Sequence, residues 1–283
     1  MNILIADSGT SKTDWVLLGE ESPQFIRTEG LNPQLISATD FLTILTHELK
    51  PNLLGNAIHK VFFYSSGCDH SQKQDEVAAY FREVFEFAKI SVSTDLEAGG
   101  VALFGEGEGF VGVLGSGSHA GIFKKGQMIE KIPVLEYPRG NEGSGSDIGK
   151  RIMMEYLNGN MPKELKEFLE SNIQVSLEEI FLKIQTPKEA KLFLSEVCKV
   201  MTSKSNHAFM QHIIYEGFNN FLVRITEAFP EKVSVLEIGF VGTVASVFEA
   251  ELRACAKQKG MEVFSIVRSP IEHIALHYKR ILK

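Results

Sequence analysis

A short turn near the start of the chain has the residue types of a phosphate-binding loop. Small residues let backbone N–H groups close on an anion, and a lysine and several hydroxyls add further donors. An aspartate at the start of such a turn can orient a metal-bound water, and a cation beside phosphates neutralises their charge. An ordinary polar hairpin is the alternative, because the turn lacks the spacing of a Walker loop and is followed by a strand. Its residues are Asp7, Ser8, Gly9, Thr10, Ser11, Lys12 and Thr13.

Apolar runs at 3–5 and 15–18 flank this turn and predict two antiparallel strands. Strands and helices then alternate, which indicates an α/β fold, and the opening hairpin predicts mixed rather than wholly parallel sheets. Further strands are expected at 24–28, 61–64, 90–93, 110–114, 120–123, 128–132, 233–238 and 263–267. Helices are expected from 37 onward and at 75–88, 98–104, 163–170, 177–184, 188–201, 208–228, 244–259 and 271–282.

Length, charge and cysteine content narrow the class of protein. The 283 residues suffice for two domains of ordinary size, and the net charge of -7 argues against a nucleic-acid partner. No run approaches the ~20 apolar residues that span a bilayer, and the first residues form a strand rather than a signal peptide. We therefore expect a cytoplasmic protein with no membrane partner. Three isolated cysteines, which match no disulfide, zinc or iron–sulfur spacing, agree with a reducing compartment: Cys68, Cys198 and Cys255.

A glycine-rich, acidic break at 105–109 predicts a domain boundary, with one domain at 1–107 and another at 108–283. After the break, a strand, a small-residue turn at 115–118 and another strand repeat the opening pattern. Two similar halves that face each other would form a cleft.

Four small-residue turns, at 7–13, 115–118, 140–144 and 239–243, occur in this order together with Asp95 at a strand end. With this set the chain resembles the sugar-kinase, Hsp70 and actin superfamily of ATPases. More narrowly, it is similar to the N-acetylglucosamine kinases and the related BadF/BadG/BcrA/BcrD ATPases. The resemblance implies a two-domain actin-like ATPase fold with ribonuclease H-like sheets, use of ATP with Mg²⁺, and a homodimer. It also implies that the last helix could pack back on the first domain.

The resemblance assigns roles by motif. Asp95 would be the catalytic base that accepts the proton of a sugar 6-hydroxyl, and Asp7 would serve the metal. The implied ATP-binding residues are Asp7, Gly9, Thr10, Ser11, Lys12, Thr13, Gly115, Ser116, Gly117, Gly239, Gly242 and Thr243. The implied substrate-binding residues, for an amino sugar, are Asn32, Ser66, Gly67, Asp95, Asn141 and Glu142.

Several alternatives stay open. An aspartate between a strand and a helix is often an N-cap, a role that Asp95 could share with Thr94. Asn141 stands where the family has an aspartate, and an amide hydrogen-bonds without charge assistance. Residues 135–139 also depart from the family pattern, so ATP binding is better supported than N-acetylglucosamine specificity. A non-catalytic protein that binds ATP and sugar, or a BadF-type ATPase activator with an iron–sulfur cluster, are the competing hypotheses.

Overall fold

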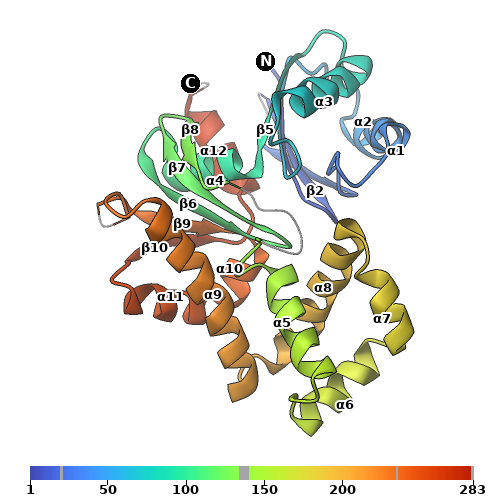
Figure 1. Cartoon of the computed structure of the whole chain (residues 1–283). Helices are drawn as coiled ribbons and strands as arrows, with labels where there is room; N and C mark the ends of the chain where they lie inside the picture. Colours follow the sequence, from blue (N-terminus) through green and yellow to red (C-terminus); the bar gives the residue numbers. More distant parts are fainter. Residues whose placement is uncertain (20–21, 134–139, 234, 282–283) are drawn as a thin grey trace. The chain divides into compact units, whose positions relative to one another are not determined.

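The computed structural model describes residues 1–19, 22–133, 140–233 and 235–281 (Figure 1). The departures noted at 135–139 therefore lie outside the described residues. The chain forms two compact units, and each is assembled from more than one stretch. Unit 1 comprises Met1–Gly107, Phe123–Met128 and Ser269–Lys283, and unit 2 comprises Glu108–Ile122 and Ile129–Arg268.

Unit 1 contains a mixed five-stranded sheet in the order β3-β2-β1-β4-β5. The central strand β1 pairs antiparallel with β2 and parallel with β4, so the carboxyl end of β1 meets the turn into β2. This end of the sheet therefore carries both the predicted phosphate turn and the loop that follows β4. The strands are β1 (Ile3–Ser8), β2 (Thr13–Leu18), β3 (Gln24–Thr28), β4 (Lys60–Ser65) and β5 (Lys89–Thr94).

Both faces of the two central hairpin strands are buried. Leu4 and Trp15 lie in the cluster on one face, while Ile3 and Val16, one residue along each strand, are buried as well. Strands buried on both faces require helices on both sides. The helices of unit 1 are α1 (Ala38–Thr43), the π-helix η1 (Ile44–Leu49), α2 (Lys50–Asn52), α3 (Ser71–Val84), α4 (Asp95–Phe104) and α12 (Ile271–Ile281).

Helix α12 is fixed in unit 1 by aromatic contacts. The Tyr278 ring stacks on Phe62 with 4.4 Å between centroids, and its hydroxyl lies 2.8 Å from that of Tyr64. A C-terminal segment thus completes the N-terminal unit, as residues far apart in sequence supply one core.

Unit 2 is built on a second five-stranded sheet, in the order β10-β9-β6-β7-β8. Strand β9 pairs parallel with both β6 and β10. Two mixed five-stranded sheets with flanking helices confirm the predicted α/β class (Figure 1). The strands are β6 (Glu108–Leu114), β7 (Ser118–Lys124), β8 (Gln127–Lys131), β9 (Ile238–Val241) and β10 (Val263–Val267).

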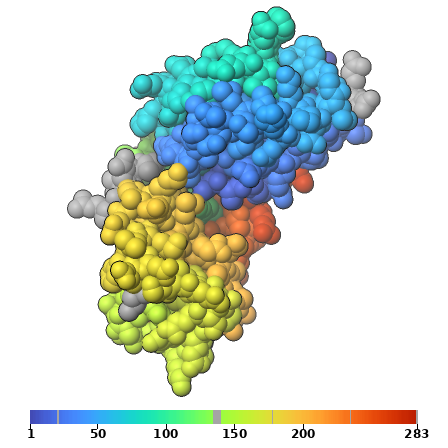
Figure 2. Space-filling view, turned by 90° about the vertical axis from the view of Figure 1, so that its right-hand side faces the viewer, coloured from blue at the N-terminus to red at the C-terminus, as the bar shows by residue number. Residues whose placement is uncertain are grey.

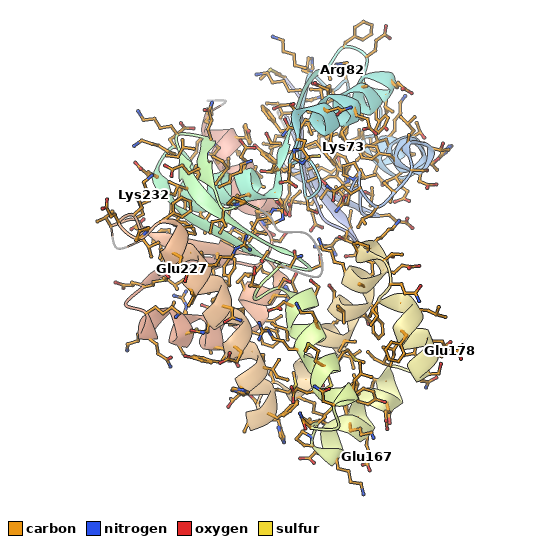
Figure 3. All side chains as sticks on the ribbon, viewed as in Figure 1. Lys73, Arg82, Glu167, Glu178, Glu227 and Lys232 are labelled. Carbon is orange, nitrogen blue, oxygen red and sulfur yellow. The ribbon has the colours of Figure 1, made fainter. Side chains whose placement is uncertain are left out.

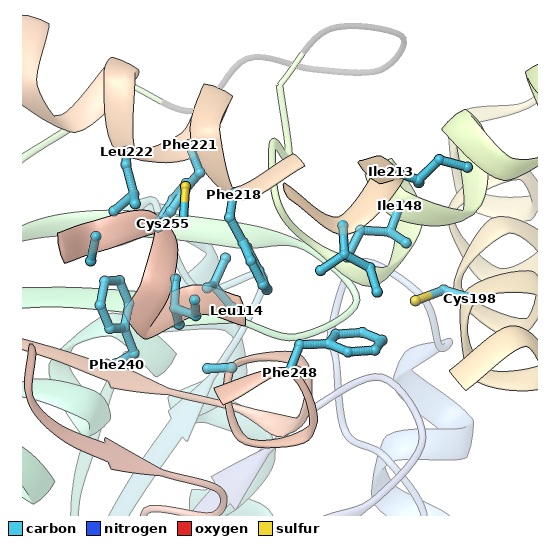
Figure 4. Close-up of a cluster of buried hydrophobic side chains, with 14 of the residues drawn as sticks. Leu114, Ile148, Cys198, Ile213, Phe218, Phe221, Leu222, Phe240, Phe248 and Cys255 are labelled. Carbon is cyan, nitrogen blue, oxygen red and sulfur yellow. The ribbon is translucent and has the colours of Figure 1, made fainter. Parts of the chain in front are cut away.

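Helices supply most of the core of unit 2. Phe218 and Phe221 of α9 pack with Phe240 and Phe248, and Cys198 and Cys255 are buried in the same cluster (Figure 4). Residues of α7 and α8 lie in the yellow part of the surface in Figure 2. The helices are α5 (Gly145–Leu157), α6 (Lys163–Asn172), α7 (Leu177–Lys183), α8 (Pro187–Met201), the 3-10 helix η2 (Thr202–Lys204), α9 (Ala208–Ala228), α10 (Thr243–Val247) and α11 (Glu249–Gln258).

Exposed charged side chains lie on helices of both units, as Arg82 of α3 and Glu167, Glu178 and Glu227 of unit 2 illustrate (Figure 3). Within the described residues, no helix is both long and apolar enough to cross a membrane.

Two predictions near the C-terminus were wrong. The strand expected at 233–238 is β9, which begins at Ile238, because only from there do residues pair with β6 and β10. The helix expected at 244–259 is divided at Phe248, whose backbone (φ -109, ψ 37) is not helical. The Phe248 ring is buried edge-to-face against Phe218, so core packing redirects the chain there.

Candidate active site

The first predicted phosphate turn joins β1 to β2 in unit 1. The Gly9 N–H donates to the Lys12 carbonyl at 3.0 Å and closes the turn. Below it, the Ser8 and Thr13 hydroxyls lie 2.9 Å apart, and both accept from the Leu31 N–H, at 3.1 and 3.2 Å. Ser8 and Thr13 are therefore buried and stabilise the turn through hydrogen bonds, whereas Gly9 and Ser11 are its exposed residues. A ligand role for Thr13 would have to replace these bonds.

The lysine of this turn belongs to a charged cluster that the sequence reasoning missed. Lys12 forms an ion pair with Asp14, and the Arg27 Nε donates to the other Asp14 oxygen at 2.6 Å. Asp14 is mostly buried, which acts to raise its pKa, but hydrogen bonds and charge from Lys12 and Arg27 hold that pKa below its ordinary value. The sequence predicted a strand at 24–28 that includes Arg27, but the pairing of Arg27 with Asp14 between β3 and β2 comes from the structure.

Asp95 lies at the start of α4, in the same unit as the first phosphate turn. The N-cap is Thr94, whose hydroxyl accepts from the Glu97 N–H at 3.2 Å in a capping box. Asp95 is the first helical residue, so its interpretation as the cap was wrong. Its carboxylate is close enough to Asp7 to influence that residue's titration.

Asp7 is half-buried on β1, directly opposite Asp14 in the strand register. Burial, followed by the nearby carboxylates of Asp95 and Asp14, raises the pKa of Asp7 to about 7, while Lys12 opposes the shift. An acid whose pKa is higher in the folded than in the unfolded chain disfavours folding once it ionises. The free energy of unfolding of the ligand-free protein should therefore fall as pH rises from about 4 through 7.

Asp7→Asn removes that penalty. We expect the ligand-free variant to unfold at a temperature about 2–6 °C above wild type at pH 8, and with little difference at pH 4. Thermal unfolding by circular dichroism at both pH values checks this. An equal shift at both pH values would contradict the assignment to Asp7 ionisation.

The predicted sugar-side residues of unit 1 come together. The Asn32 amide donates to the Ser66 Oγ at 3.1 Å, and its oxygen accepts from the Gln34 N–H at 3.0 Å. Gly67 has φ +93, and a Cβ there would lie 2.5 Å from the Asn32 oxygen, so only glycine fits. An amide has two N–H donors and two acceptor sites, which leaves Asn32 capacity for a ligand.

The second predicted phosphate turn, at 115–117, joins β6 to β7 in unit 2. The Gly115 N–H donates to the Gly117 carbonyl at 2.9 Å, and the Gly145 N–H at the start of α5 donates to the Gly115 carbonyl at 2.8 Å. Ser118, which follows the turn, is 7% exposed, and its hydroxyl has no hydrogen-bond partner in the part of the chain that the structure describes. A buried hydroxyl of this kind is satisfied when a ligand or water reaches it.

The loop at 140–144 is tied to this turn through Asn141. Its side-chain oxygen accepts from the Ser118 N–H at 3.3 Å, and its backbone has φ +59, a conformation that asparagine tolerates. Glu142 pairs with Arg224 at 2.7 Å, a contact across 82 positions that the sequence reasoning missed. The buried Asp147 accepts from the Gly143 N–H at 3.1 Å and holds the loop against α5.

The turn predicted at 239–243 is shorter in the structure. Gly239 lies inside β9, paired with Val111 and Ser265, so the turn at 239–243 reduces to Gly242 and Thr243. Gly242 has φ +122, and a Cβ there would lie 2.4 Å from the Leu114 carbonyl. Gly242 is thus packed directly against the strand end that leads into the second phosphate turn.

Comparisons with known proteins agree with this fold. No family model matches the chain, and no curated protein matches it. A solved structure from Porphyromonas gingivalis, whose proposed activity is N-acetylglucosamine kinase, is 26% identical with a TM-score of 0.90, over 99% of this chain and 100% of that one. A Chromobacterium violaceum structure with the same proposed activity is 14% identical with a TM-score of 0.77, over 98% of each chain. A ROK hexokinase from Thermus thermophilus is 13% identical with a TM-score of 0.55, over 99% of this chain and 100% of that one.

The resemblance to N-acetylglucosamine kinase-like proteins that the sequence indicated is confirmed by the first of these structures, and the actin-like sugar-kinase fold by all three.

Proposed function

We propose that this chain is an ATP-dependent carbohydrate kinase that phosphorylates the 6-hydroxyl of N-acetylglucosamine or a related amino sugar. Full-length similarity to the Porphyromonas gingivalis structure supports the class of reaction. One observation carries the proposal: the Asp95 carboxylate, next to the cap residue Thr94, is near enough to help raise the pKa of Asp7, the first residue of the predicted phosphate turn. A base beside a phosphate-binding turn is the arrangement that phosphoryl transfer to an alcohol requires.

In this mechanism the Asp95 carboxylate accepts the proton of the sugar 6-hydroxyl. The sugar oxygen bonds to the γ-phosphorus as the bond from that phosphorus to the β,γ-bridging oxygen breaks, and ADP leaves. Because the transition state is loose, the protein acts mainly by positioning and by charge stabilisation. Gly9, Gly115 and Gly117 have no side chain and would let the backbone of the two turns approach the phosphates closely, with Lys12 as a cation.

Amide and carboxylate groups would select the sugar. Asn32 and Ser66 already form a hydrogen-bonded pair in unit 1, which orients both side chains for hydroxyl recognition. In unit 2, Arg224 fixes the Glu142 carboxylate by an ion pair of 2.7 Å. Asn141 would use its N–H donors toward the sugar, since its oxygen serves Ser118.

The Asp7 carboxylate of unit 1 suits Mg²⁺ that is held jointly with substrate phosphates. This ion takes carboxylate oxygens and is usually held by one or two carboxylates together with substrate phosphates. Asp7 is half-buried, and Asp95 and Asp14 add negative charge around it. Asp7 would hold the ion, which supplies charge neutralisation to the phosphates.

The proposal is tested by ADP release from ATP with a panel of N-acetylglucosamine, N-acetylmannosamine, glucosamine and glucose. We expect sugar-dependent turnover that is fastest with an N-acetylated amino sugar, and a 6-phosphate product by phosphorus NMR. Folded protein that binds ATP and sugar but releases no ADP would reject the kinase and favour the non-catalytic hypothesis.

The activator hypothesis is disfavoured by the cysteines. All three are buried, and Cys68 lies in unit 1 whereas Cys198 and Cys255 lie in unit 2. Among the described residues no group of three or more potential ligands could hold a metal ion. Iron in the purified protein would restore this hypothesis.

A further inference from the structure

Helix α8 packs against α5 with almost no space between their backbones. A Cβ on Gly149 of α5 would lie 1.8 Å from the Leu194 carbonyl of α8, and a Cβ on Gly145 would lie 3.9 Å from the Ser195 Cα. The first residue of α5, Gly145, donates to the Gly115 carbonyl of the second predicted phosphate turn, so this packing places one side of α8 beside that turn.

A lysine from this side of α8 reaches the turn itself. The Lys191 Nζ lies 3.0 Å from the position that a Cβ on Gly117 would occupy, and the side chain is half-buried. Glycine at 117 therefore makes room for the ammonium group. Lys191 carries its charge next to a turn of backbone N–H groups and to the positive end of the α5 dipole.

Two hydroxyls strengthen the case for a ligand here. The Ser195 Oγ, one helical turn after Lys191 on the same side of α8, is buried and has no hydrogen-bond partner among the residues described. The Ser118 Oγ, in the residue immediately after Gly117, is also buried and also has no hydrogen-bond partner among the residues described. The Ser118 hydroxyl beside the turn and the Ser195 hydroxyl on the part of α8 that faces Gly145 are donors that an anionic oxygen cluster would satisfy, and Lys191 adds positive charge there.

We propose that Lys191 and Ser195 of α8 complete a subsite for the phosphates of a nucleoside triphosphate at the second glycine turn. The proposal rests on the proposed function, and it adds to it a helix that none of the predicted motifs includes. The ammonium of Lys191 binds non-bridging phosphate oxygens, and Ser195 donates a weaker hydrogen bond.

Equilibrium titration of the full chain with MgATP and, separately, with adenosine tests the subsite. Lys191→Met should weaken ATP binding about 10- to 100-fold, as expected for loss of a charge-assisted hydrogen bond. Its adenosine affinity should stay within twofold of wild type. Lys191→Arg should recover much of the ATP affinity, and Ser195→Ala should lose about 2- to 5-fold.

Lys199→Met is the matched control, because Lys199 lies on the same helix, is exposed and pairs with Glu196 at 3.2 Å. It should bind ATP as wild type does. The subsite is rejected if Lys191→Met binds ATP within twofold of wild type, or if it loses ATP and adenosine affinity equally. If Lys191→Met does not fold, Lys191→Gln and Lys191→Arg are compared instead. The subsite predicts a lower ratio of ATP to adenosine affinity in Lys191→Gln, and an equal ratio in both variants would reject it. Absence of sugar phosphorylation with the ATP effect intact would refute the kinase and leave the subsite standing.

Discussion

Asp95→Asn is expected to lower sugar phosphorylation by about 100- to 10,000-fold, the range for removal of a positioned general base. The amide keeps the size of the side chain but cannot accept the proton. Thr94 still caps α4 through its bond to Glu97, so the fold should be retained. Initial rates of ADP formation at saturating sugar, with ATP binding measured by titration, separate a loss of chemistry from a loss of nucleotide.

Asp75→Asn is the control for charge removal, because Asp75 is an exposed carboxylate on α3 of the same unit. Its rate should match wild type. An Asp95→Asn protein that keeps more than a tenth of wild-type turnover would exclude Asp95 as the base. A protein that loses ATP affinity to the same degree as turnover would assign Asp95 to binding instead.

Gly149→Ala should reduce the free energy of unfolding by about 2–4 kcal/mol. Helix propensity alone predicts the opposite sign, since alanine in a helix interior is favoured over glycine by about 1 kcal/mol. The added methyl group would lie 1.8 Å from the Leu194 carbonyl, so α8 must move away from α5. Thermal or urea unfolding of the purified variant measures the change.

Gly217→Ala is the matched control, because it is another helix-interior glycine of unit 2, where a Cβ would have no neighbour nearer than 3.4 Å. Its stability should stay within about 1 kcal/mol of wild type. A Gly149→Ala protein as stable as wild type would show that α5 and α8 do not pack as described. If the Lys191 subsite is correct, Gly149→Ala should also weaken ATP binding, since it displaces the helix that carries Lys191.

Local patterns determined much of the secondary structure. The predicted bounds of β3 (24–28), α9 (208–228) and β10 (263–267) are those observed. These segments have a clear period of alternation or of helical spacing, and turn residues end them. The small-residue turns that follow β1 and β6 were equally local, because glycine and hydroxyl residues favour a tight backbone there. The turn expected at 239–243 was not, since Gly239 lies inside β9.

Segments without a local signal were misassigned. Residues 233–238 are apolar enough for a strand, but pairing with β6 and β10 decides that β9 starts at Ile238. The break at Phe248 depends on the position of Phe218, which lies on a different helix. Contacts between distant segments override propensity, and such contacts cannot be read along the chain.

The tertiary structure alone decided which polar groups surround each turn. Arg224 meets Glu142 across 82 positions, and Lys191 reaches Gly117 from the helix that the sequence predicts at 188–201. The second contact depends on how closely α8 approaches α5. That distance is determined by glycines such as Gly149, where a side chain would collide with the facing helix. The sequence does not reveal this requirement, because it does not show which backbone faces the glycine.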